Sequence, residues 1–263
     1  MHPYLPVELV ENIVEQVEDQ NTLAACSLTC RTWASIAQSK YFSRIHFSPS
    51  LDKTTRFLEV IRESPHIALL PRSIRSYQWD VGDEDGRACL AQIASLLVNV
   101  SSLCLEGVRL GFHSSQKIVG AFPALQELQF YGCDIDLGAL SSFFQSHPTL
   151  RTLSFHLGVV IQVNPDQELL PLVRLQHLRV FCTEDISRLI PLLIHHEAPL
   201  APVELLGLDS LRPSDNANAC TLLFGLRHTL RVLEIGASYF QDKLCSSDGT
   251  CVSINKFIPL TGL

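Results

Sequence analysis

The chain has 263 residues, of which 46% are hydrophobic and 18% charged, and its 20 basic and 27 acidic side chains give a net charge of −7. This composition predicts one or two globular domains and excludes a largely disordered chain, because disorder goes with few apolar residues and high charge. The acidic balance provides no general attraction for phosphate backbones, so we do not expect nucleic acid as a partner.

No segment of the sequence is expected to cross a membrane. The longest apolar run, at 189–194, is far shorter than the ~20 residues of a spanning helix and contains Pro191. Glu8, Glu11 and Glu15 stand where a secretory leader would be basic and then apolar. Nine cysteines without a Cys-x-x-Cys pair favour a reducing compartment, so we expect a cytoplasmic or nuclear protein, or both.

The first forty residues are predicted to form two short amphipathic helices. Pro6 and Glu8 favour a helix start, since proline suits the first turn and an acid complements the helix dipole. A second helix is expected over residues 23–37, after a polar break. Two such helices cannot bury both apolar faces on each other, so either the following domain or another protein must cover them.

The N-terminal segment contains Leu5-Pro6-Val7-Glu8-Leu9, then Ile13 and Val17, and then the stretch from Leu23 to Cys30-Arg31-Thr32-Trp33. Over roughly residues 4–47 this combination resembles the F-box motif. One departure is Tyr41-Phe42, which stands where the family often has a second tryptophan.

The resemblance implies that one face of these helices docks on the small Skp-family adaptor. The residues at the family's docking positions are Leu5, Pro6, Leu9, Ile13, Leu23 and Cys26. Three others, Leu28, Trp33 and Ile36, are expected to hold the helices together.

The rest of the chain repeats an apolar pattern, L-x-x-L-x-L, with large apolar residues at its three positions. The pattern occurs seven times, and its first positions are separated by 26, 25, 25, 25, 28 and 27 residues. The occurrences are Ile74/Tyr77/Trp79, Val100/Leu103/Leu105, Leu125/Leu128/Phe130, Leu150/Leu153/Phe155, Leu175/Leu178/Val180, Val203/Leu206/Leu208 and Leu230/Leu233/Ile235. An earlier strand is expected at Phe42/Ile45/Phe47, and a last one near Phe257/Leu260 stays open.

The third occurrence extends to the full leucine-rich-repeat template, with Cys133 at the turn position. That position holds other residue types elsewhere, namely Val108, Gly158, Thr183, Leu211 and Ser238, so the resemblance is to irregular, F-box-associated repeats of the fungal type. Helices are expected between the strands, at residues 87–99, 139–146, 186–196 and 216–228. The predicted fold is α/β: a small helical F-box at 1–47, then an irregular leucine-rich-repeat solenoid of about seven repeats at 48–263, with parallel strands inside and helices outside.

The sequence contains none of the enzyme motifs that we sought. It has no Gly-x-Ser-x-Gly, no phosphate loop and no Gly-x-Gly-x-x-Gly, and His195-His196-Glu197 lacks the spacing of a zinc motif. Asp83-Glu84-Asp85 is expected to be a solvated loop, and Cys26 and Cys30 are expected to pack as apolar residues. We therefore expect no catalytic activity, no metal and no cofactor.

By resemblance, the combination implies a substrate-recognition subunit of an SCF-type cullin–RING ubiquitin ligase, with the F-box on the adaptor and the repeats on a target protein. The alternative is a leucine-rich-repeat scaffold or inhibitor whose N-terminal helices only cap the repeats.

The target site is predicted on the concave face, where the residues that alternate with the buried leucines point. The last such residue of each strand gives the row Asp80, Glu106, Tyr131, His156, Phe181, Asp209 and Gly236. Aromatic residues and arginine dominate binding hot spots. We therefore predict that the target contacts Tyr131, His156, His177, Arg179 and Phe181, the alternative being that these side chains pack on one another or under a C-terminal segment.

Overall fold

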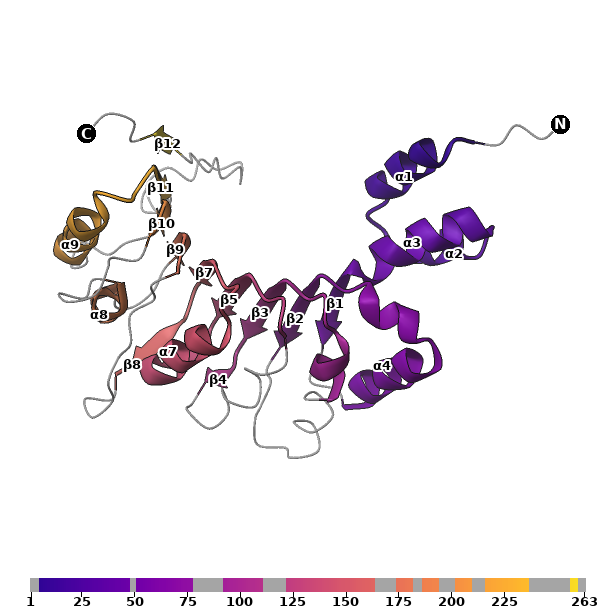
Figure 1. Ribbon diagram of the computed structural model, residues 1–263, viewed down its shortest axis with the longest axis horizontal. Coiled ribbons are helices and arrows are strands. Elements are labelled where there is room, and N and C mark those ends of the chain that lie inside the picture. Colours follow the sequence, from indigo (N-terminus) through magenta and orange to yellow (C-terminus); the bar gives the residue numbers. More distant parts are fainter. Residues whose placement is uncertain are drawn as a thin grey trace, which may run out of the picture.

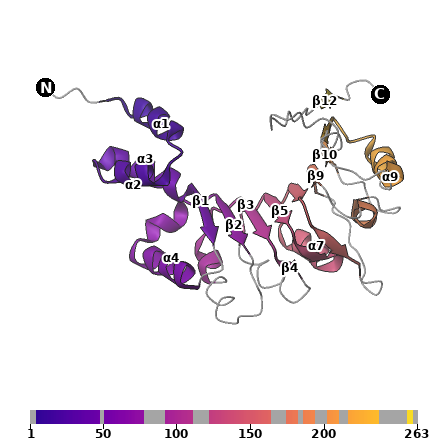
Figure 2. The ribbon, with the colours of Figure 1, turned by 180° about the vertical axis from the view of Figure 1, so that it is seen from behind.

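A three-helix unit at the N-terminus leads directly into a curved sheet in the computed structural model (Figure 1). The structure describes residues 5–47, 51–77, 92–110, 122–163, 174–181, 186–193, 202–209, 216–236 and 256–259. In both views the helices that follow the N-terminal unit lie on one side of the sheet, which is the convex side of its bend (Figure 2).

The N-terminal unit consists of α1 (Val7–Gln16), α2 (Gln20–Ser27) and α3 (Arg31–Ser43). The single helix expected over 23–37 is therefore wrong, because the chain breaks between α2 and α3. The hydroxyls of Ser27 and Thr29 donate hydrogen bonds to the carbonyl oxygens of Ala24 and Cys26, at 2.6 and 2.8 Å. Such side-chain bonds compete with helical ones and favour a helix end.

This unit has a small core of its own. Its buried members are Val10, Val14, Leu23 and Ala37, with Val17, Cys26, Trp33, Ile36 and Tyr41 packed around them. Lys40 of α3 donates from Nζ to the carbonyl oxygens of Val14 and Glu15, which closes the C-terminal end of α1. The Asp19 carboxylate accepts the backbone N–H of Thr22 at 2.7 Å and caps α2.

Within the described residues the main sheet has nine strands, and each lies beside the strand of that sheet that precedes it in the chain. Their order is β1 (Arg44–Phe47), β2 (Ser73–Tyr77), β3 (Ser102–Glu106), β5 (Glu127–Tyr131), β7 (Thr152–Phe155), β9 (His177–Phe181), β10 (Leu205–Asp209), β11 (Val232–Gly236) and β12 (Lys256–Pro259). All neighbours are parallel except β11 and β12, which are antiparallel. A smaller parallel sheet joins β4 (Arg109–Leu110), β6 (Asp134–Asp136) and β8 (Val160–Gln162).

The helices after the N-terminal unit are α4 (Leu51–Glu63), α7 (Leu137–Ser146), α8 (Ile190–Leu193) and α9 (Asn216–Leu226), with 3-10 helices at Pro65–Leu69 and Ile186–Leu189. Helix α7 begins two residues before the expected range, because Asp136 accepts the N–H of Ala139 at 2.8 Å and caps it. Within the expected helix at 87–99, residues 92–96 are helical and residues 87–91 lie outside the described part of the chain.

The strand register shows that one predicted repeat was read in the wrong frame. Ile74 pairs with Leu103, so it occupies the second position of the pattern rather than the first. The inward position two residues later holds Ser76, which is 1% exposed, whereas Tyr77 lies on the opposite face. The frame Ile74/Tyr77/Trp79 is therefore wrong by three residues, because a serine occupies a core position where the pattern requires a large apolar side chain.

The core lies between the main sheet and the helices. One column of paired residues, among them Leu103, Leu128, Leu153, Leu178 and Leu206, is completely buried. Of the residues that alternate with this column, Gln129 and Arg179 are half-buried on the other face, whereas Cys104 and Ser154 are buried. We call this second face, on β1 to β11, the open face.

Several predicted features lie outside the described residues. These are Trp79, Asp80, Asp83–Asp85, Thr183, His195–Glu197, Leu211, Ser238 and the expected loop at 242–255. In the described ranges, no helix has both the length and the apolar character needed to traverse a lipid bilayer.

Gly132→Ala is expected to lower the free energy of unfolding by about 1–2 kcal/mol, since a Cβ is disfavoured at positive φ. Gly132 follows β5 with φ +56°, at the turn into β6. Urea titrations of the two proteins would measure the difference. Gly225→Ala within α9 is the control, and it should leave stability unchanged or raise it by up to about 1 kcal/mol; equal effects would contradict the turn argument.

Candidate functional site

The first candidate site is an uncovered apolar face on and just before α1. Leu5, Leu9 and Ile13 are 49, 49 and 46% exposed, although Val10 and Val14 on the same helix are each 1% exposed. Helix α1 therefore has two apolar faces, and only one of them belongs to the core of the three-helix unit. Adjacent exposed apolar side chains of this kind are typical of a surface that binds another protein.

The structure places the six predicted docking residues in three different environments. Leu5, Pro6, Leu9 and Ile13 are exposed, and Cys26 is half-buried on α2. Leu23 is 3% exposed and packs in the core of the unit, so assigning it to a docking surface was wrong. Leu28 was expected to hold the helices together, but it is 86% exposed because it follows the last turn of α2.

A groove of about 330 Å³ lies beside Cys26, between α2 and α3. Its lining residues are Thr22, Ala25, Cys26, Thr29, Cys30 and Trp33. Cys26 is half-buried and Cys30 is exposed, so the expectation that both cysteines pack as apolar residues is wrong for Cys30 and only partly met for Cys26.

The second candidate site is a row of stacked rings on the open face. Tyr131 of β5 and His156, directly after β7, stack with ring centroids 3.8 Å apart and planes 5° from parallel. His156 and Phe181 of β9 continue the stack at 4.8 Å and 16°. All three rings are half-buried. We call Tyr131, His156 and Phe181 the ring stack.

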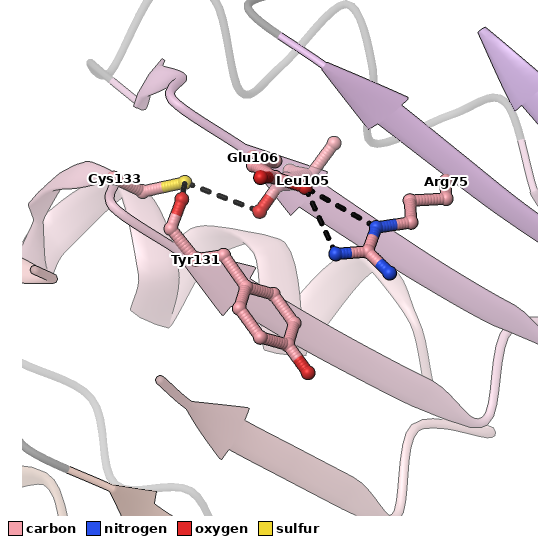
Figure 3. A network of polar contacts seen from close by, with 5 residues as sticks. All are labelled: Arg75, Leu105, Glu106, Tyr131 and Cys133. Atoms are coloured by element: carbon pink, nitrogen blue, oxygen red, sulfur yellow. Dashed lines mark hydrogen bonds and ion pairs between the residues drawn. The ribbon is translucent and has the colours of Figure 1, made fainter. Parts of the chain in front are cut away.

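Arg75 of β2 closes one end of the ring stack. Its guanidinium carbon lies 5.2 Å from the ring centroid of Tyr131 and 5.2 Å from that of Tyr77. The same guanidinium donates two hydrogen bonds to Oε2 of Glu106, at 3.0 and 3.2 Å (Figure 3). Tyr77 pairs with Glu106 in the strand register, so Tyr77 is the β2 member of the predicted row of open-face residues. The prediction of Asp80 for that position is wrong.

Arg179 occupies the middle open-face position of β9, and its side chain extends across β10. It donates to both carboxylate oxygens of Glu234 on β11, at 3.2 and 3.3 Å, although β10 lies between the two strands. The residue between them is Gly207, where an added Cβ would lie 3.0 Å from Cγ of Arg179. His177 bonds through Nδ1 to the Thr152 hydroxyl at 3.3 Å and takes no part in the ring stack.

Burial sets the electrostatics of the open face. Loss of hydration lowers the pKa of His156 to about 4, and the charges of Arg75 and Arg179 act in the same direction. Burial also raises the pKa of the Tyr131 phenol and raises that of the Cys104 thiol to about 11. His156 and these two groups are therefore uncharged at neutral pH.

Cys133, at the predicted turn position, contacts the C-terminal ends of two neighbouring strands, β3 and β5. Its thiol donates to the carbonyl oxygens of Leu105 and Tyr131, each at 3.3 Å, and the side chain is completely buried (Figure 3). The two other predicted turn residues that the structure describes, Val108 and Gly158, have no side-chain donor to make such a bond.

Stability should decrease as the pH falls from about 6.5 to about 4, because the unfolded chain binds a proton at His156 before the folded chain does. His156→Phe keeps a ring in the stack and removes the titration. Between pH 7.5 and 4.5 the variant should lose about 1–2 kcal/mol less unfolding free energy than the wild type, a value reduced for partial exposure. Urea titrations at both pH values measure this, and identical losses would contradict it.

The described residues contain no group of three or more His, Cys, Asp or Glu side chains arranged to hold a metal ion.

Comparison with known protein families identifies a domain in the segment that carries the apolar face of α1. Residues 2–48 match the model of the F-box-like family, so the chain carries an F-box-like domain. The matched segment contains α1 to α3 and ends just after β1, so it includes the exposed face of α1. No curated protein matches the chain.

Proposed function

We propose that the chain is the substrate-recognition subunit of an SCF-type cullin–RING ubiquitin ligase. The observation that carries this proposal is the F-box-like domain at residues 2–48, whose α1 presents an uncovered apolar face. Domains of this family bind Skp-family adaptors. In this role the chain bridges two proteins and performs no chemistry itself.

The sheet and its outer helices serve in this proposal as an irregular leucine-rich-repeat solenoid. Support comes from the consecutive parallel strands in one register and from the leucine column at their centre. The buried Cys133 thiol, which contacts the carbonyl oxygens of Leu105 on β3 and Tyr131 on β5, is a second feature that fits the repeat template.

The target binds the open face at Tyr131, His156, His177, Arg179 and Phe181. Support comes from the half-exposed ring stack and from the two arginine–glutamate pairs at its sides. A cluster of aromatic anchors surrounded by polar groups is the arrangement that concentrates binding energy in protein interfaces.

Co-expression with a Skp-family adaptor tests the ligase role. The expected result is a stable one-to-one complex, together with aggregation of the chain when it is produced alone, because the α1 face would then meet water. A chain that is monodisperse alone and forms no complex would overturn the proposal.

The same experiment separates a second function, a scaffold whose N-terminal helices cap the sheet. One observation favours capping: α3 runs directly into β1, and Arg72 N–H donates to the carbonyl of Ser43 at 2.9 Å. A capping role does not explain why the apolar side chains of Leu9 and Ile13 on α1 are exposed. It predicts the monodisperse chain that the ligase role excludes.

A further inference from the structure

We propose that the segment of the target that binds the ring stack is uncharged and unphosphorylated, and that it contacts the stack through aromatic and aliphatic side chains. The inference rests on the proposed function, because it assumes that the open face binds a target. It adds the chemical class of that target.

The two arginines beside the ring stack, Arg75 and Arg179, are already paired. Arg75 donates two hydrogen bonds to Glu106, and Arg179 donates to both oxygens of Glu234. Recognition of a phosphate by arginine uses these same N–H groups, two at a time. A phosphate on the target would therefore have to displace a carboxylate from each arginine.

The carboxylates are occupied to the same degree. Glu106 and Glu234 accept the two guanidinium groups, and Glu127 accepts the side-chain amide of Gln129 at 2.7 Å. Asp209 also has an interaction of its own. A basic segment would gain no unpaired acid from these residues.

The rings also disfavour a cationic target group. An aromatic cage binds an ammonium ion with ring faces, which carry the negative part of the ring quadrupole. In the stack, the faces between Tyr131, His156 and Phe181 cover one another, and Arg75 already lies at the Tyr131 end. Tyr131 and His156 therefore offer their ring edges for contact, and the weakly positive hydrogens of these edges pack well against aliphatic groups, aromatic faces and sulfur.

The centre of the surface is neutral for a further reason. His156 stays unprotonated at neutral pH, since burial and the two neighbouring guanidinium groups oppose its charge. Among the described residues of the open face, the remaining arginine is Arg44 on β1, three strands away from β5 in the sheet. The region of the ring stack is thus an apolar centre with balanced charges around it, which complements an apolar segment.

An array of synthetic 12-residue peptides tests this chemistry with the full chain in its adaptor complex. Each peptide is made with a central serine and with a central phosphoserine, on either aromatic and aliphatic flanks or polar flanks. The expected result is binding of the unphosphorylated apolar peptides, weakened at least threefold by the phosphate. Tyr131→Ser with Phe181→Ser should reduce this binding by at least about tenfold. Phe224→Ser, at an aromatic residue 68% exposed on α9, is the matched control and should leave it unchanged.

A second variant releases the arginines without touching the rings. Glu106→Gln with Glu234→Gln removes both carboxylate charges, and it should raise binding of the phosphoserine peptides by at least about tenfold. An increase in phosphoserine-peptide binding is informative because a misfolded variant would not bind these peptides more tightly. An absence of any gain would overturn the argument from paired arginines.

Three further outcomes would overturn the inference. The first is selection of phosphopeptides by the wild type, lost on Arg75→Gln with Arg179→Gln. The second is peptide binding that the ring substitutions leave unchanged. The third is a dimer in light scattering that dissociates on the ring substitutions, since a second copy would then occupy the face. Binding of the chain to the adaptor is measured in a separate experiment. Absence of that binding would overturn the ligase role, and peptide binding by the chain could still be measured and interpreted.

Discussion

Leu9→Asp combined with Ile13→Asp is expected to abolish co-purification of the chain with a Skp-family adaptor. Both side chains are nearly half exposed on α1, one helical turn apart, so neither contributes to the core of the three-helix unit. The substitutions place two carboxylates in an apolar interface, where unpaired charge is costly to bury. We expect the affinity to fall by at least about 100-fold, with the helical content unchanged.

The matched control makes the same kind of change at another exposed place. Leu157 and Val163, which are 71 and 44% exposed, lie near β8 in the sheet domain. Leu157→Asp with Val163→Asp adds the same charge to the chain and should leave adaptor binding intact. Undiminished binding by the α1 variant in a pull-down or by calorimetry would show that this face is not the adaptor interface.

Phe155→Ala is expected to produce the largest loss of stability, about 3–5 kcal/mol, the range for removing a buried aromatic ring. Phe155 is completely buried, and its ring stacks on that of Phe130 with centroids 5.7 Å apart. The pair lies on the inner side of the same strands that carry Tyr131 and His156. The substitution leaves a cavity that the neighbouring strands, fixed in register, cannot close.

The control for this prediction is a phenylalanine of the same size at the surface. Phe224 of α9 is 68% exposed, and its ring contacts the guanidinium of Arg227 at 3.9 Å. Phe224→Ala should cost no more than about 1 kcal/mol. Urea titrations at neutral pH compare the two variants, and similar losses would contradict the position of Phe155 in the core.

The ring stack links the Phe155 prediction to the proposed target site. Phe130 and Phe155 are buried beneath the sheet, and the residues that follow them, Tyr131 and His156, stack on the opposite face. A cavity at Phe155 is therefore expected to disturb peptide binding as well as stability. Phe181→Ser, which changes only the open face, should affect binding with a much smaller loss of stability.

Much of the arrangement could be predicted from the sequence because it depends on local patterns. A recurrence of about 25 residues places leucines at the same point of successive strands, and parallel neighbours then follow from stacking one unit on the next. The alternation along each strand separates Leu128 and Phe130 from Gln129 and Tyr131, so the row of residues on the open face could be read in advance. The F-box likeness likewise depends on a contiguous segment.

Other elements left a weaker signal or none. Helix α4 was missed, although Thr54, Leu58 and Ile61 are buried at helical spacing and could have indicated it. The small sheet of β4, β6 and β8 has strands of only two or three residues, too short for any periodicity. The frame of β2 was misread because Ser76 is a polar residue at a core position.

The recurring apolar residues were enough to predict the strand order, the buried column and the members of the open-face row from Glu106 onwards. The interactions that the side chains of that face make follow from the folded chain alone. It paired Arg75 with Glu106 across one strand boundary and Arg179 with Glu234 across two, and it buried Leu23 while leaving Leu9 uncovered. The physical reason is that pairing and burial depend on side chains brought together from residues 31 and 55 positions apart in the chain, a distance over which no local pattern carries information.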